Sequence, residues 1–98
     1  MSIKEDAELY EKAAIAAIYV KRNNPVKAIE ALEAFSTQLF GEEPLSDSLS
    51  EDLRSAKNYA KVFGQPAVWN EYRNIAQLIS IYASKYPLSL DDLEENIE

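Results

Sequence analysis

Apolar residues recur along the chain at intervals of three and four, which is the spacing of an amphipathic α-helix. They mark four long segments, at about 3–22, 25–40, 49–63 and 66–86, and a short fifth segment at about 90–97. No stretch alternates between apolar and polar residues as a half-buried strand does. The pattern therefore predicts an all-α fold, either an antiparallel four-helix bundle or a related helical array, with a short C-terminal helix.

Residues that commonly begin or end helices stand at the boundaries of these segments. Asn24 can cap a helix, and Pro25 suits the first position of the helix that follows. Gly41 and Gly64 are expected to end the second and third helices. Ser89 can cap the last helix. Because these boundary residues agree with the apolar spacing, the two signals predict the same elements.

The composition is that of one ordinary globular domain spanning residues 1–98. Hydrophobic residues make up 47% of the chain and charged residues 28%, which differs from the composition of disordered proteins. Two glycines and four prolines are too few for the tight turns of a small β-sandwich or barrel. No uninterrupted apolar run approaches the ~18 residues of a transmembrane helix, so no membrane span is expected.

The formal net charge of −7 restricts the classes of partner. An acidic protein repels nucleic-acid phosphates and anionic lipid headgroups, so direct binding of nucleic acid or membrane is not expected. A basic protein partner is favoured, because complementary fields accelerate encounter. The alternative is that the charge only keeps a small protein soluble.

The chain contains no histidine and no cysteine. These absences remove the usual general base, the usual nucleophile pairs and the commonest nitrogen ligand of metals. No phosphate-binding loop or glycine-rich dinucleotide turn is present. We therefore predict a non-enzymatic protein with no catalytic residue, metal site or cofactor. The lack of cysteine fits a reducing compartment, and the expected location is the cytoplasm.

The segment 66–86 is the most informative for function. Eleven consecutive residues, 74–84, carry no charge, and the polar face of this predicted helix is neutral. Interface cores are depleted in charge and enriched in aromatic residues. This face is therefore expected to pack on another chain, or else the helix is the most buried one and the C-terminal segment covers it. The candidate partner-binding residues are Trp69, Asn70, Arg73, Asn74, Gln77, Leu78 and Ile81.

The C-terminal segment 88–98 is acidic and contains no basic residue. Its candidate partner-binding residues, with a steering role, are Asp91, Asp92, Glu94 and Glu95. One alternative is that the segment docks on a basic row formed by Arg54, Lys57 and Lys61, or is simply solvated. Another is that its carboxylates imitate the phosphates of nucleic acid.

The predicted function is non-enzymatic binding to another protein, as a small inhibitor, immunity-type protein, adaptor or chaperone would do. Two alternatives stay open. The chain could be a self-assembling structural subunit, with a homodimer formed through the helix at 66–86. It could also be an acidic nucleic-acid mimic that blocks a DNA-binding protein.

Overall fold

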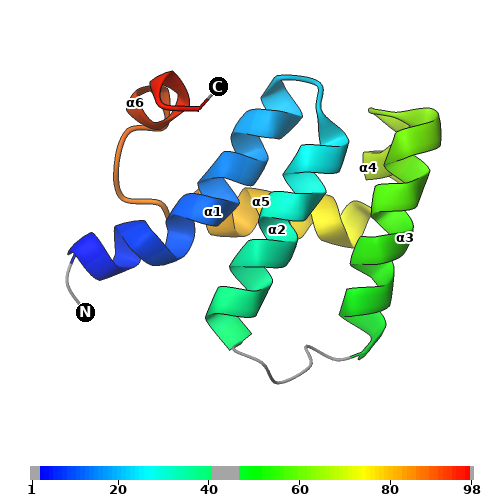
Figure 1. The fold of residues 1–98 in the computed structure, drawn as a ribbon, viewed down its shortest axis with the longest axis horizontal. Helices are drawn as coiled ribbons and strands as arrows, with labels where there is room; N and C mark the ends of the chain where they lie inside the picture. Colours follow the sequence, from blue (N-terminus) through cyan, green and yellow to red (C-terminus); the bar gives the residue numbers. More distant parts are fainter. Residues whose placement is uncertain (1–2, 41–46, 98) are drawn as a thin grey trace.

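A computed structural model of the chain describes residues 3–40 and 47–97 (Figure 1). Within these residues the chain forms six helices and no strand, so the predicted all-α fold is confirmed. The helices are α1 (Ile3–Lys21), α2 (Pro25–Phe40), α3 (Asp47–Phe63), α4 (Ala67–Glu71), α5 (Arg73–Ala83) and α6 (Leu90–Glu95). Helices α1, α2 and α3 lie side by side, and α5 runs across the back of α1 and α2 (Figure 1). The arrangement is thus a two-layered helical array.

The predicted boundary residues act as expected where the structure describes them. The side-chain oxygen of Asn24 accepts a hydrogen bond from the backbone N–H of Lys27 at 3.3 Å, which caps α2. Gly64 follows α3 with φ of +65°, the left-handed conformation that ends many helices. Ser89 caps α6 by accepting a hydrogen bond from the N–H of Asp92 at 3.3 Å. Gly41 lies outside the described residues.

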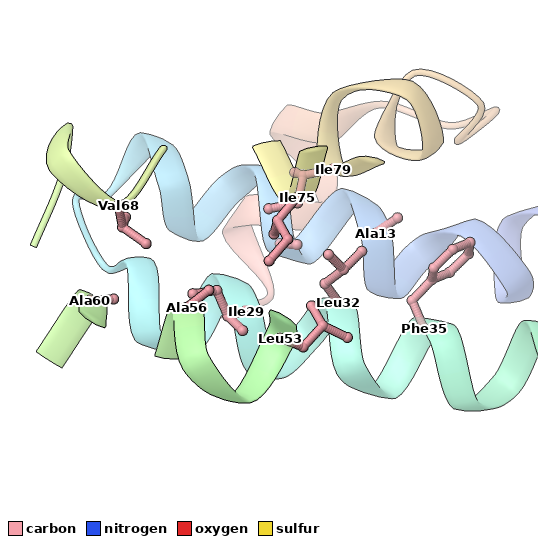
Figure 2. Close-up of a cluster of buried hydrophobic side chains, with 11 residues drawn as sticks. Ala13, Ile29, Leu32, Phe35, Leu53, Ala56, Ala60, Val68, Ile75 and Ile79 are labelled. Carbon is pink, nitrogen blue, oxygen red and sulfur yellow. The ribbon is translucent and has the colours of Figure 1, made fainter. Parts of the chain in front are cut away.

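The main core lies between the two layers (Figure 2). Ile29, Leu32 and Phe35 of α2 are at most 1% exposed, and side chains from α1, α3, α4 and α5 surround them. The buried members of this cluster are Ala13, Ala16, Ile29, Leu32, Phe35, Leu53, Ala56, Ala60, Val68, Ile75 and Ile79. The helical spacing of these apolar residues in the sequence is therefore the spacing of one buried face on each helix.

The prediction of a single helix over 66–86 is wrong, because the helix breaks at Tyr72. The backbone there has φ of −116° and ψ of 62°, outside the helical region, and it separates α4 from α5. Before the break, Val68 reaches the core beside α3, and after it Ile75 and Ile79 reach the core from α5 (Figure 2). Helices α4 and α5 therefore reach the same core as two separate segments. Helix α5 also ends at Ala83, before the predicted stop at Pro87.

Helix α6 packs on the outer face of α1. Leu93 of α6 is 8% exposed and forms a small second core with Ala14 and Ile18 of α1. Glu94 makes ion pairs with Lys21 at 3.1 Å and with Arg22 at 3.2 Å. The acidic segment therefore docks on the C-terminal end of α1.

Docking of the acidic segment on the basic row of α3, one of the sequence-based alternatives, is wrong. Helix α3 lies at the opposite side of the molecule from α6 (Figure 1). Within the row, Lys57 pairs instead with Glu33 of α2 at 3.0 Å. Helix α6 is held by an apolar side chain as well as by a charge, so its position depends on the apolar face of α1. The pattern of charges in the sequence does not predict that position.

Candidate functional site

The neutral face of α5 is exposed. Asn74, Gln77 and Ile81 all face solvent, and Ile81 keeps 52% of its surface accessible. The opposite face of the same helix carries Ile75 and Ile79, which are 0% and 4% exposed. The charge-free stretch therefore contains one core face and one solvent face, and the polar residues predicted to contact a partner lie on the solvent face.

Nothing in the described part of the chain covers this face of α5. The C-terminal helix α6 lies against α1, and its buried residue Leu93 packs on Ala14 and Ile18. The alternative interpretation, in which the C-terminal segment covers the neutral face, is therefore wrong for the described residues. A neutral helix face with an exposed isoleucine is thus left open to solvent.

Trp69 forms one wall of a groove beside this face. The groove has a volume of about 350 Å³ and lies between α1, α4 and α5. The indole Nε1 of Trp69 donates a hydrogen bond to the side-chain oxygen of Gln65 at 3.0 Å. The Gln65 amide in turn donates to the carbonyl oxygen of Val20 at 2.7 Å. This chain of two hydrogen bonds holds the half-buried tryptophan, which packs on the core as well as lining the groove.

The other walls of the groove come from small or apolar residues of α1 and α5. They are Ala17, Val20, Ala76, Ile79 and Ser80. Ser80 is exposed and also belongs to the neutral face, so the groove and the face form one continuous surface. We call this surface the α5 face; it comprises the groove and the exposed residues of the charge-free segment 74–84, namely Asn74, Gln77, Ser80, Ile81 and Ser84.

The remaining predicted residues of this region divide into exposed and half-buried ones. Asn70 and Arg73 are exposed at the α4–α5 break. Asn74 is exposed but donates a hydrogen bond to the carboxylate of Asp52 on α3 at 3.3 Å. Leu78 is half-buried and packs against the main core. The structure thus brings all seven predicted residues to α4 and α5, while giving Leu78 and Trp69 a share in the core.

The predicted acidic residues of the C-terminal segment lie on α6. Asp91, Asp92 and Glu95 are exposed, whereas Glu94 is half-buried. Hydrogen bonds from Lys21 and then from Arg22 lower the pKa of the Glu94 carboxyl below its ordinary value of 4.5. Arg22 also donates to the carbonyl oxygens of Glu94 and Ile97, at 3.3 Å and 3.2 Å. Glu94 therefore anchors α6, and its charge is balanced within the chain.

A second and larger cleft lies between α1 and the segment that leads into α6. Its volume is about 660 Å³. Glu8 and Glu11 line it from α1, and Asp92 lines it from α6. Tyr86 also lines it, and desolvation, followed by the charges of Glu11 and Asp92, raises the pKa of this tyrosine.

The sequence pattern did not predict this cleft. Glu8 and Glu11 are three residues apart, which places them on the same side of a helix, and this spacing was the available signal. The position of α6 against α1 was needed to bring Asp92 and Tyr86 to the same place.

Two features are absent from the described residues. No three acidic side chains among them lie close enough together to hold a metal ion. None of the described helices is both long and apolar enough to cross a bilayer.

Comparison with known proteins gives no further indication of function. No protein-family model matches the chain, and the curated proteins and the solved structures likewise give no match.

Proposed function

We propose that this chain is a non-enzymatic protein that binds another protein through the α5 face. A small inhibitor, an immunity-type protein, an adaptor or a chaperone would each use such a surface. The observation that carries the proposal is the exposed, charge-free side of α5, with Ile81 at 52% exposure among neutral polar residues. Solvated helix faces in an acidic protein usually carry lysine and glutamate, whereas the centres of interfaces lack charge.

The groove beside Trp69 gives this surface a place for an anchoring side chain. Tryptophan is enriched among the residues that dominate binding energy, and such anchors sit in well-packed pockets. The two hydrogen bonds through Gln65 fix the indole before a partner arrives. The side chain of Trp69 therefore loses little conformational freedom when a partner binds, which reduces the entropic cost of association.

The overall charge of the chain favours a basic partner. The net charge of −7 attracts a positively charged protein, and the exposed carboxylates of Asp91, Asp92 and Glu95 add to that field. Their role in this proposal is to steer the partner during approach. The lack of cysteine is consistent with action in the reducing cytoplasm.

The non-enzymatic part of the proposal rests on the residue inventory. Without histidine and cysteine, proton transfer or nucleophilic attack would depend on carboxylates, tyrosine, serine or lysine. Catalytic carboxylates usually show strongly perturbed environments. The lowered pKa of the Glu94 carboxyl has a structural cause, namely its hydrogen bonds with Lys21 and Arg22.

Self-association through the same surface is the second candidate function. Asn74, Gln77 and Ser80 each carry donors and acceptors, so this side of α5 can pair with a copy of itself in a two-fold arrangement. The nucleic-acid mimic receives less support, because Glu94, one of its four proposed carboxylates, is paired within the chain.

Affinity capture from the native host tests the main proposal. Ile81→Arg should keep the far-ultraviolet circular dichroism of the parent and weaken capture of the specific partner by about tenfold or more. The reason is that a charge would be buried without a counter-ion at the interface. The matched control is Val62→Arg, which changes a 74% exposed aliphatic residue on α3. The proposal is wrong if both variants capture the partner equally well.

Light scattering after size exclusion separates the two candidates. A monomer at all accessible concentrations would exclude the homodimer. A dimer that Ile81→Arg dissociates and Val62→Arg leaves intact would make a second copy the partner.

A further inference from the structure

The cleft between α1 and α6 combines an apolar wall with charged groups of a single sign. Leu93 and the 54% exposed Leu88 form apolar parts of its lining. Tyr86 contributes an aromatic ring beside them. The volume of about 660 Å³ lies within the range of roughly 300–1,000 Å³ that is usual for ligand pockets. The cleft can therefore hold side chains of a bound segment.

Among the described residues, the charged groups that line the cleft are all acidic. Glu8 and Asp92 are exposed and Glu11 is half-buried, and no lysine or arginine is among the described lining residues. The basic residues that bind α6, Lys21 and Arg22, are engaged with Glu94 at the C-terminal end of α1. The negative field in the cleft is thus not neutralised by the ion pairs that dock α6.

A second exposed leucine lies two residues from Leu88 in the chain. Leu88 belongs to its lining, and Leu90, the first residue of α6, is 42% exposed. Exposed leucines next to carboxylates suit a ligand that is both apolar and cationic. The ammonium or guanidinium group of such a ligand would be attracted to the carboxylates and to the face of the Tyr86 ring.

We propose that this cleft binds a short, basic, amphipathic segment of a partner protein. Lysine or arginine side chains of the segment pair with Glu8, Glu11 and Asp92. An apolar side chain packs against Leu88 and Leu93. The site is separate from the α5 face, because none of its lining residues belongs to α4 or α5.

Charge decides among the classes of occupant. Nucleic acid and anionic lipid headgroups would be repelled by the three carboxylates. A second copy of the chain carries the same net charge of −7, so two copies repel at long range. A bound metal ion does not account for the apolar wall, and no three described acidic groups come close enough to hold one. A cationic segment with an apolar side can both pair with the carboxylates and pack against the apolar wall of the cleft.

Calorimetric titration of the full chain with synthetic peptides tests the proposal. The probe is a short peptide of lysine and leucine with helical amphipathic spacing. The controls are a lysine and serine peptide of the same length and charge, and a glutamate and leucine peptide. The lysine and leucine peptide should bind at least about tenfold more tightly than either control, because only it offers both contacts.

A matched pair of double variants locates the binding. Glu11→Gln with Asp92→Asn should weaken binding of the probe by about tenfold or more. Glu51→Gln with Glu71→Gln changes the net charge equally at exposed positions outside the cleft and should leave the affinity nearly unchanged. Equal weakening by the two doubles would show that only net charge attracts the peptide, and would overturn the proposal.

Further variants test the apolar contact and the separation of the two sites. Leu88→Ser should reduce affinity for the lysine and leucine peptide, whereas Val62→Ser on α3 should not. The Ile81→Arg variant should bind the probe like the parent chain. A failure of peptide binding at the cleft can therefore be distinguished from a failure of partner binding at the α5 face. The proposal is overturned by absence of probe binding, by equal binding of the lysine and serine peptide, or by self-association that the Glu11 and Asp92 changes abolish.

Discussion

The two isoleucines Ile79 and Ile81 provide a direct test of which side of α5 is buried. They lie two residues apart on one helix and have the same side chain, yet Ile79 is 4% exposed and Ile81 is 52% exposed. Changing each to alanine removes the same atoms from two different environments. The proposed function depends on this difference, because Ile81 offers a partner most of its side chain, whereas Ile79 only borders the groove.

The expected losses of stability follow from burial. Ile79 packs in the main core, where truncation to alanine leaves a cavity and typically costs about 2–5 kcal/mol. Full burial of such a side chain stabilises by about 1.5–3 kcal/mol, and Ile81 keeps about half of its surface in water. Alanine also has a higher helix propensity than isoleucine, by a few tenths of a kcal/mol. Ile81→Ala should therefore cost about 1 kcal/mol or less.

Urea unfolding followed by far-ultraviolet circular dichroism measures both free energies of unfolding. A domain of this size is typically stable by about 5–15 kcal/mol, so both variants should remain largely folded in water. The slopes of the two transitions should agree, which shows that the variants expose similar surface on unfolding. Equal losses, or a larger loss for Ile81→Ala, would refute the assignment of the exposed face and with it the basis of the α5 proposal.

Two further predictions concern the ends of helices. Gly64 has φ of +65° and open space around the position of a Cβ, so Gly64→Ala should cost about 1 kcal/mol from backbone conformation alone. Thermal unfolding would show this as a decrease of about 4–8 °C, and an unchanged or raised midpoint would contradict it. The lowered pKa of Glu94 means that its ion pairs stabilise the fold above pH 4.5, and that this contribution is lost as the pH falls through the lowered pKa. The stability difference between the parent and Glu94→Gln should therefore be present at neutral pH and shrink on acidification, and a difference that is independent of pH would contradict this.

The sequence determined the helical class and most helix boundaries, because these depend on neighbours in the chain. Asn24 caps α2 through a hydrogen bond to a residue three positions away, and Gly64 ends α3 through its own backbone conformation. The apolar spacing of α2 marks the residues that are buried. Each of these features is a local property of the backbone and its adjacent side chains.

The break at Tyr72 was decided by tertiary structure. No glycine or proline stands there to interrupt the helix. Tyr72 instead contacts Tyr59 of α3, with ring centroids 5.8 Å apart, and it is packed against the main core. Similarly, Val62 and Phe63 are apolar residues of α3 and yet are 74% and 61% exposed.

The candidate sites also depend partly on local sequence and partly on tertiary structure. The absence of charge between residues 74 and 84 is visible in the sequence, and it led to the residues of the α5 face. Whether that face was buried or open depended on where α6 packs, and this was decided by the match of Leu93 to Ala14 and Ile18. The same contact brings Asp92 to the cleft that Glu11 lines, although 81 positions separate them in the chain. Helical periodicity identifies which side of a helix is apolar and will be buried. The helix that covers that side is determined only when all the apolar faces pack together.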